Sequence, residues 1–186
     1  VVPWCSRCGT ALSSHELALG YAEVEDQSVF LKFKLAEQSA RKLVPDNDLP
    51  VYILSWTTTP WTLPGNVALA VEESIEYVMI NHGPSSGTPK PNVSAGIYVL
   101  AKDALPGLVK YEEFKEIAPE LSSFLFSQKR GERKPYPYKT VRGKDLVGLE
   151  YEPLFKIPAL KNSAAYKIYE ADFVTTTDGT GVVHTA

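Results

Sequence analysis

The most informative stretch of the sequence is VYILSWTTTPWTLPGN, which occupies residues 51–66. Its first seven residues, 51–57, are mostly β-branched and aromatic, which predicts a largely buried strand. Pro60 and Pro64 cannot donate backbone hydrogen bonds to a neighbouring strand, so we expect them to end it. The stretch therefore predicts a strand end that delivers the three adjacent hydroxyls of residues 57–59, an indole and an amide to one place, which suits a small-ligand site.

Further strands are predicted on both sides of this stretch. Residues 28–35 (SVFLKFKL) alternate apolar and polar side chains, which is typical of a half-buried strand. Shorter strands are expected at 67–71, 77–80, 97–101 and 167–175, and in a last run into His184. Helical spacing occurs only at 102–126, in two pieces that we expect to be broken by Pro106 and Pro119. Strands separated by turns, with two minor helices, predict an α+β domain centred on a β-barrel.

Length and composition are typical of one globular domain. The chain has 186 residues, of which 44% are hydrophobic and 22% charged. No run approaches the roughly 18 consecutive apolar residues of a membrane span, and the N-terminus does not resemble a secretory signal. The first residue is not methionine, so we expect a piece of a longer chain. Two cysteines are too few for a disulfide scaffold, which favours a reducing cytoplasm.

Charge is unevenly distributed along the chain. Residues 129–144 hold seven basic residues against Glu132, a net charge of +6, so the rest carries −9 of the total of −3. One basic strip on an acidic body favours local contact with a polyanion over wholesale wrapping. A solvated charged loop is an equally weighted alternative. Residues 83–96 are expected to form a mobile loop, and 112–144 a variable insertion that contains the basic strip.

A second chemical segment, TTTDGTGVVH, occupies residues 175–184. Its two glycines permit a close approach of a ligand to the main chain. His184 follows them on a predicted strand, and a lone histidine is more often structural than functional. The run 57–59 has an equally plain alternative, a threonine-rich edge strand that is ended by prolines. From these patterns alone, both readings stay open.

The two segments together carry a family resemblance. The run TTTPWTLPGN at 57–66 is followed much later by DGTGVVHTA at 178–186. In this order they resemble the editing insertion (CP1 domain) of isoleucyl-tRNA synthetases, which are class I enzymes. The related valyl and leucyl enzymes carry an arginine in the first run, where this chain has Thr59-Pro60-Trp61, so the isoleucyl branch is favoured. The N-terminal residues 3–21 are similar too.

The resemblance implies a β-barrel with peripheral helices, one editing domain over 1–186, inserted into the catalytic domain of a larger isoleucine–tRNA ligase. It implies hydrolysis of valyl-adenylate and of valyl-tRNA(Ile). A synthetic pocket that accepts isoleucine cannot keep out valine, because one missing methylene is worth only about 1–3 kcal/mol, a limit for which the isoleucyl-tRNA synthetases are the standard example. A second pocket that admits valine and rejects isoleucine by size multiplies the discrimination.

Site roles follow from the resemblance position by position. The implied catalytic residues are Thr57, Thr58, Thr59 and His184. The threonines would hold the ribose or the acyl carbonyl and place the attacking water, while His184 would exclude the longer isoleucine side chain. The implied substrate-binding residues are Trp61, Thr62, Asn66, Gly179, Thr180, Gly181 and Val182. Of these, Trp61 would form an apolar wall, Thr62 a size gate and Asn66 a polar contact, and the glycines would let the loop approach the adenosine.

No general base or covalent nucleophile is evident, and there is no G-x-S-x-G motif. The predicted mechanism is hydrolysis by an oriented water with help from the ribose hydroxyl of the substrate. In the family, an aspartate beyond the Val-His-Thr-Ala segment grips the α-amino group of the substrate. This chain ends at Ala186, before that position, and Asp178 is not taken to replace it. We therefore expect the chain by itself to bind weakly or to be inactive.

Cofactors and partners are predicted as follows. Cys5 and Cys8 are half of a zinc knuckle, and because zinc requires four ligands we expect two free thiols and no metal here. The resemblance places the partner pair beyond this chain. Editing needs no cofactor, whereas the parent enzyme is implied to use ATP, magnesium and zinc. The partners are the acceptor end of tRNA(Ile), valyl-adenylate and the rest of the parent chain, with no membrane, and the chain is expected to be a monomer.

The candidate tRNA contacts lie in the basic strip and are Lys129, Arg130, Arg133 and Lys134. Tyr136 and Tyr138 are interleaved with the basic residues and are suited to stacking on an unpaired base. Three rival functions remain at this stage: a non-catalytic RNA-binding module, the editing domain of a valyl or leucyl enzyme, and a structural insertion that has lost editing.

Overall fold

The computed structural model describes residues 2–20, 27–46, 48–82, 95–108, 138–160 and 162–186. The chain begins with a two-stranded antiparallel hairpin and a short helix. These elements are β1 (Trp4–Cys5), β2 (Thr10–Ala11) and α1 (Ser14–Gly20). Within the described ranges, no helix has the length and apolar character needed to cross a membrane.

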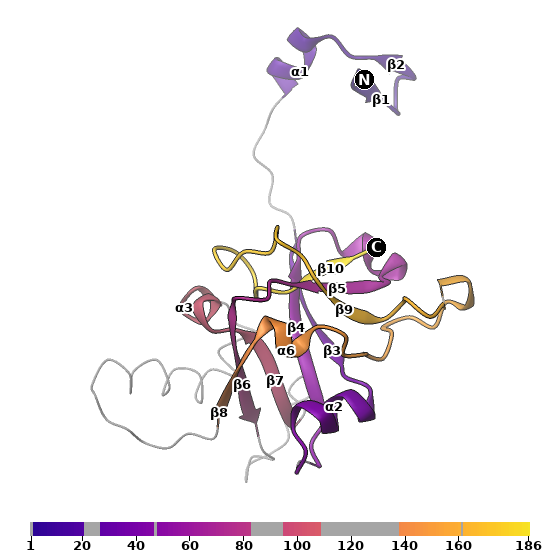
Figure 1. The fold of residues 1–186 in the computed structure, drawn as a ribbon. Helices are drawn as coiled ribbons and strands as arrows, with labels where there is room; N and C mark the ends of the chain where they lie inside the picture. The colour runs from indigo at the N-terminus through magenta and orange to yellow at the C-terminus, as the bar shows by residue number, and fades with distance from the viewer. Residues whose placement is uncertain (1, 21–26, 47, 83–94, 109–137, 161) are drawn as a thin grey trace.

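The largest sheet has five strands in the order β3-β4-β7-β6-β8 (Figure 1). Its strands are β3 (Val29–Lys34), β4 (Val51–Thr57), β7 (Gly96–Ala101), β6 (Glu76–His82) and β8 (Tyr138–Arg142). Only the β4–β7 pair is parallel, with Val51 opposite Ile97. The other neighbours are antiparallel. The three inner strands, β4, β7 and β6, are therefore paired along both edges.

A second sheet has three strands in the order β10-β5-β9. They are β10 (Val183–Thr185), β5 (Ala68–Val71) and β9 (Lys167–Glu170). Strand β5 pairs antiparallel with β10 and parallel with β9. The predicted α+β class is confirmed. The predicted closed barrel is not seen in the part of the chain that the structure describes, because the edge strands β3 and β8 each pair on one side only and the sheets stay open.

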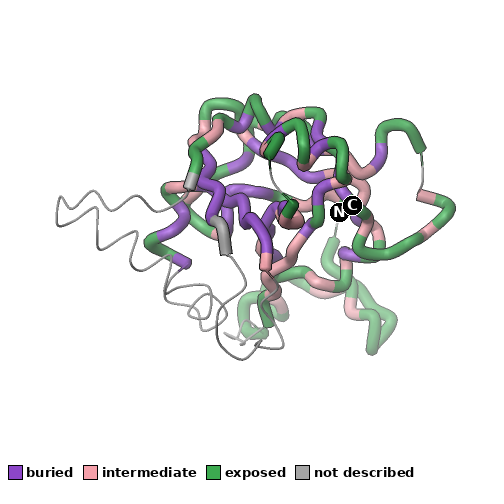
Figure 2. The backbone as a smooth tube through the Cα atoms, turned by 90° about the horizontal axis from the view of Figure 1, so that it is seen from below, coloured by how far each residue is buried: buried purple, intermediate pink, exposed green. Residues whose placement is uncertain are grey.

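The core lies where the strands of the large sheet are most covered, as the purple segments of Figure 2 show. Every residue of β7 is buried, and β4 is buried at all but two positions. Such runs, apolar on both faces, are typical of central strands. Tyr77 and Tyr98 are fully buried, and the hydroxyl of Tyr77 donates to the carbonyl of Gly181 at 2.7 Å. A core residue thus contacts the glycine-containing segment 179–182 directly.

Short helices complete the fold. They are α2 (Glu37–Leu43), η1 (Pro60–Gly65), η2 (Lys102–Ala104), α3 (Leu105–Leu108), α6 (Gly143–Leu146) and η3 (Pro158–Leu160). Helix α2 was not predicted. Pro106 was expected to break a helix, but it stands at the second position of α3, where proline is well tolerated because its missing N–H has no partner to lose. The strand predicted at 167–175 ends earlier, at Glu170.

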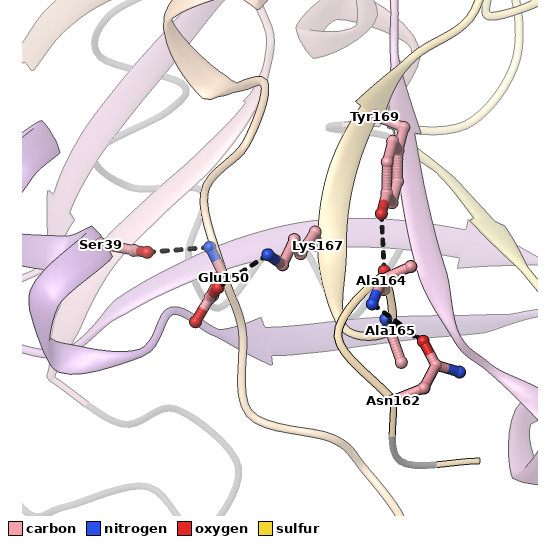
Figure 3. Close-up of polar contacts among 7 residues, drawn as sticks. All are labelled: Ser39, Glu150, Asn162, Ala164, Ala165, Lys167 and Tyr169. Carbon is pink, nitrogen blue, oxygen red and sulfur yellow. Dashed lines mark hydrogen bonds and ion pairs between the residues drawn. The ribbon is translucent and has the colours of Figure 1, made fainter.

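A polar network ties α2 to the second sheet (Figure 3). The hydroxyl of Ser39 on α2 accepts from the backbone N–H of Glu150 at 2.8 Å, and the Glu150 carboxylate pairs with Lys167 on β9 at 3.1 Å. On the same strand, the hydroxyl of Tyr169 donates to the carbonyl of Ala164 at 2.6 Å. Two side chains of β9, those of Lys167 and Tyr169, therefore bind to the preceding segment of the chain.

Several predictions fall partly or wholly outside the described ranges. The candidate tRNA contacts Lys129, Arg130, Arg133 and Lys134 lie there, as does most of the loop predicted at 83–96. The end of the predicted insertion forms β8 and α6. The guanidinium of Arg142 donates to the carbonyl of Ser74 at 2.7 Å, so this basic residue supports the fold. The division of the chain into one editing domain stays a prediction.

Candidate functional site

Three threonines gather at the end of β4, where the chain turns into η1. The buried Thr57 hydroxyl accepts from the backbone N–H of Thr59 at 3.1 Å and lies 3.2 Å from the Thr59 hydroxyl. Thr58 and Thr59 are exposed. The strand end thus presents its hydroxyls partly to the interior and partly to solvent.

His184 meets this cluster from β10. Its Nε2 atom lies 3.3 Å from the hydroxyl of Thr57 and 3.4 Å from that of Thr62. The Thr62 hydroxyl already donates to the carbonyl of Thr59 at 2.8 Å, so it can only accept from His184. Two segments that are far apart in the sequence therefore meet through one imidazole.

The protonation state of His184 follows from its surroundings. Burial lowers the pKa of the imidazole, because it disfavours the charged form, and the ring is neutral near pH 7. The Nδ1 atom is buried and has no partner among the atoms that the structure describes. A buried donor without a partner is rarer in proteins than an unpaired acceptor, so the favoured tautomer carries its proton on Nε2. In this state the ring donates to the threonine hydroxyls.

The opposite wall is the segment from Gly179 to Val182. Gly179 and Gly181 have φ angles of +72° and +71°, which favour glycine. A Cβ atom on Gly179 would lie 3.1 Å from the Trp56 ring, and one on Gly181 only 2.3 Å from the Cβ of Ala101. The backbone at Gly181 therefore approaches its neighbour more closely than any larger residue allows, and the approach at Gly179 is tight.

Hydrogen bonds from the large sheet hold this wall in place. The buried Ser55 hydroxyl donates to the carbonyl of Val182 at 2.8 Å. The buried Thr180 hydroxyl donates to the carbonyl of Leu54 at 2.7 Å. The backbone N–H of Ala101 donates to the carbonyl of Thr180 at 2.8 Å. Thr180 thus anchors the wall with its side chain, which points into the fold.

Together these segments enclose a cavity of about 280 Å³. Its size suits a small acyl group with the rest of a larger ligand outside. It is lined by Trp56, Thr57, Thr58, Thr59, Phe173, Thr175, Asp178, Gly179, Thr180, Gly181, Val182, Val183 and His184. The structure thus brings all four predicted catalytic residues and the predicted segment 179–182 to one hollow. The chemistry it offers is hydroxyl and imidazole hydrogen bonding, with one carboxylate, that of Asp178.

Three predicted substrate-binding residues do not line this cavity. Trp61 is 66% exposed, because Pro60 begins η1 and the helix turns the indole outward. Thr62 lies behind His184 and contacts it. Asn66 is 5% exposed and bonded within the protein, to Ala68, Thr185 and Tyr151. These placements give Thr62 and Asn66 supporting positions.

Sequence reasoning missed other residues at the cavity. Phe173 is 60% exposed although it is a large aromatic, and its ring is suited to stacking on an unpaired base. Trp56 lines the cavity, and its Nε1 atom is buried without a hydrogen-bond partner in the described part of the molecule. No sequence pattern marked either residue. The direction in which each of these side chains points could be assigned only once the pairing of the strands was known.

Cys5 and Cys8, the predicted half of a zinc knuckle, lie close together. They lie at the β1–β2 hairpin, where the backbone N–H of Cys8 donates to the Cys5 sulfur at 3.4 Å. This contact is the main cause of the lowered pKa of the Cys5 thiol. Across the described ranges, no group of three or more His, Cys, Asp or Glu side chains is placed to bind a metal ion. Two sulfurs cannot complete a tetrahedral zinc site.

Sequence comparison finds related proteins that match the whole chain. It is 40% identical over 186 residues to the isoleucine–tRNA ligase of Clostridium novyi and 43% identical over 192 residues to that of Cytophaga hutchinsonii. The chain spans only 14–15% of the length of these relatives. No protein-family model matches it. The resemblance to the isoleucyl branch is confirmed.

Structural comparison finds the same fold in editing domains. The crystal structure of the P. falciparum cytosolic leucyl-tRNA synthetase editing domain superposes with a TM-score of 0.52. That match covers 86% of this chain and 61% of the other, at 14% identity. The structure described as GlLeuRS-CP1 gives a TM-score of 0.50 at 12% identity, covering 86% of this chain and 54% of that one. At these identities the likeness shows the fold alone.

Proposed function

We propose, because the chain is homologous over its full length to one region of the isoleucine–tRNA ligases, that it is the proofreading unit of such an enzyme. Its substrates would be valyl-tRNA(Ile) and valyl-adenylate, and isoleucine would be excluded by size. One observation carries the proposal: the imidazole of His184 faces the threonine hydroxyls at the rim of a hollow of about 280 Å³. The hollow has room for a valine side chain, and the proposed exclusion of isoleucine rests on the close approach of His184 to Thr57.

The proposed chemistry is attack of water on the acyl carbonyl. The water oxygen bonds to the carbonyl carbon, the ester bond to the ribose breaks, and the ribose oxygen takes up a proton. For the adenylate, the bond to the phosphate oxygen breaks instead. The neutral imidazole of His184 already donates toward Thr57 and Thr62, so it is not offered as the base. Orientation of the water by hydroxyls, with help from the free ribose hydroxyl, supplies the rate.

Thr58 offers the most direct test, because its side chain is exposed at the cavity. In the intact parent enzyme, Thr58→Ala is expected to slow the hydrolysis of valyl-tRNA(Ile) by about 10–100-fold, since one hydrogen bond that orients the reacting groups is lost. The measurement is the rate of release of valine from charged tRNA. Thr10→Ala, on the exposed hairpin, is the matched control and should leave the rate unchanged. An unaltered rate in Thr58→Ala would favour a tRNA-binding insertion without chemistry.

The role of the ribose can be tested separately. Valyl-tRNA(Ile) whose terminal ribose lacks the free hydroxyl beside the ester is expected to be hydrolysed about 100-fold more slowly or worse, because the assisting group is gone. The same RNA with the hydroxyl present serves as the control, and both rates are corrected for spontaneous hydrolysis. Equal rates on the two RNAs would exclude substrate assistance and leave the protein groups to do the work.

The partners and location of the parent enzyme belong to the same proposal. The acceptor end of tRNA(Ile) and the remaining parent chain are the proposed partners, and the cytoplasm is the proposed location. ATP and magnesium would serve synthesis in another part of the parent enzyme.

A further inference from the structure

Asn66 sits in a closed hydrogen-bond network beside the cavity. Its Nδ2 atom donates to the carbonyl of Ala68 at 3.0 Å and to the carbonyl of Thr185 at 3.2 Å. Its Oδ1 atom accepts from the hydroxyl of Tyr151 at 2.7 Å. The side chain is 5% exposed, and that of Tyr151 is 3% exposed. Both amide protons are thus used inside the protein, and the amide has no donor to offer a substrate.

The direction of every bond in this network is fixed. Two carbonyl oxygens can only accept, so the amide nitrogen must face them and the amide oxygen must face Tyr151. The phenol must then be the donor. Burial raises the pKa of Tyr151 far above neutrality, so the phenol keeps its proton. No rotation of the amide would satisfy the same partners.

The two carbonyls that Asn66 holds belong to a register pair of the second sheet. Thr185 on β10 lies opposite Ala68 on β5, and His184 lies opposite Leu69. Strand β10 has three residues and, among the strands that the structure describes, pairs only with β5. So short a strand has few ladder hydrogen bonds with which to define its register. A slip by one position would turn the His184 side chain to the other face of the sheet.

We propose that Tyr151 and Asn66 are positioning residues that lock the register of β10 and so place the imidazole of His184 against the threonine cluster. The inference deepens the proposed function, on which its catalytic meaning rests. It changes the expected role of Asn66, from a polar contact with the substrate to a support of the strand that carries His184.

Tyr151 is itself firmly placed. Its ring packs edge-on against Phe33, with centroids 5.3 Å apart, and against Tyr166, with centroids 6.0 Å apart. Its backbone N–H donates to the carbonyl of Tyr166 at 2.9 Å. Tyr166 has a φ angle of +62°, a strained value for a tyrosine, and its own N–H donates to the carbonyl of Val67 at 2.6 Å. The hydroxyl that holds Asn66 therefore comes from a rigid support.

The test uses hydrogen exchange and NMR on this chain. The backbone N–H of Val67 donates to the carbonyl of Thr185 at 2.9 Å and reports the β5–β10 register directly. The backbone N–H of Ile97 donates to the carbonyl of Pro50 at 2.9 Å in the large sheet and reports the rest of the fold. In Tyr151→Phe, the protection of Val67 is expected to fall roughly fivefold or more relative to Ile97. The pKa of His184 should move up toward its ordinary value of about 6.5.

The control is Tyr169→Phe, which removes the hydrogen bond of another tyrosine hydroxyl, on β9 (Figure 3). It should alter neither the protection of Val67 relative to Ile97 nor the pKa of His184. Asn66→Ala should reproduce the effects of Tyr151→Phe, and adding Tyr151→Phe to it should add nothing further. Equal loss of protection at Val67 and Ile97, with His184 unmoved, would show general destabilisation only and would overturn the proposal. Neither the exchange protection nor the pKa of His184 is measured with a charged tRNA, so the result is independent of the outcome of the hydrolysis assays.

Discussion

Replacement of His184 by alanine is expected to make the intact parent enzyme hydrolyse its correct product, isoleucyl-tRNA(Ile). The imidazole of His184 lies 3.3 Å from the Thr57 hydroxyl and forms one wall of the cavity. Removing it enlarges the hollow by more than the one methylene that separates the two amino acids. A pocket that discriminates by one methylene reaches about 10–200-fold, so a rise of that order in the rate on isoleucyl-tRNA is expected. The measurement is deacylation of isoleucyl-tRNA and valyl-tRNA side by side.

His15→Ala supplies the control for this experiment, because His15 is exposed on α1. It should leave both rates as in the wild type. If His184→Ala slows hydrolysis of valyl-tRNA while isoleucyl-tRNA stays intact, the imidazole orders the site and size exclusion lies elsewhere. Only a gain of activity on the larger substrate supports the proposed role.

The largest loss of stability is expected for Gly181→Ala. A Cβ atom there would lie 2.3 Å from the Cβ of Ala101, which is closer than two carbon atoms can approach. The residue also has a φ angle of +71°, which costs an alanine about 1–2 kcal/mol. The overpacking adds about 1–3 kcal/mol, because the central strand β7 cannot move away. We therefore expect the free energy of unfolding, measured by urea titration, to fall by about 2–5 kcal/mol.

Gly148→Ala separates the two causes. Gly148 has a φ angle of +80°, but a Cβ atom there would meet nothing within 4 Å. Its replacement should cost only the backbone strain of about 1–2 kcal/mol. If both variants lose the same stability, the close approach to Ala101 contributes nothing and the wall is more adaptable than its geometry indicates.

The strands were predictable because their signal is local. Alternation at 28–35 and the β-branched run at 51–57 gave β3 and β4 to within a residue of each end. Helix α2 was missed because its seven residues, EQSARKL, bury only Ser39 and Leu43 and so show little amphipathic spacing. The open sheets were mistaken for a barrel because strand count does not reveal which edges pair. That information lies in contacts between distant residues.

The site was predictable where single residues carry unusual chemistry, and less so where side chains only turn in or out. Thr57 and His184 were expected to line the same cavity; the structure places both there, with the imidazole 3.3 Å from the hydroxyl. Trp61 was expected as a wall and lies outward, since a 3₁₀ turn after Pro60 sets its direction. Phe173 was not considered, because its place at the cavity depends on the path of an irregular segment. Orientation of this kind follows from packing, which no short motif contains.

The contact between Thr57 and His184 joins positions 127 residues apart. During synthesis, the histidine emerges after every strand of the large sheet, so the hollow can close only after those strands have been made. Closing a loop of this length is slow, but its entropic cost grows only with the logarithm of the length, about 0.6 kcal/mol for each doubling. Surface loops between the two residues are therefore free to lengthen or shorten during evolution with little effect on the geometry of the pair.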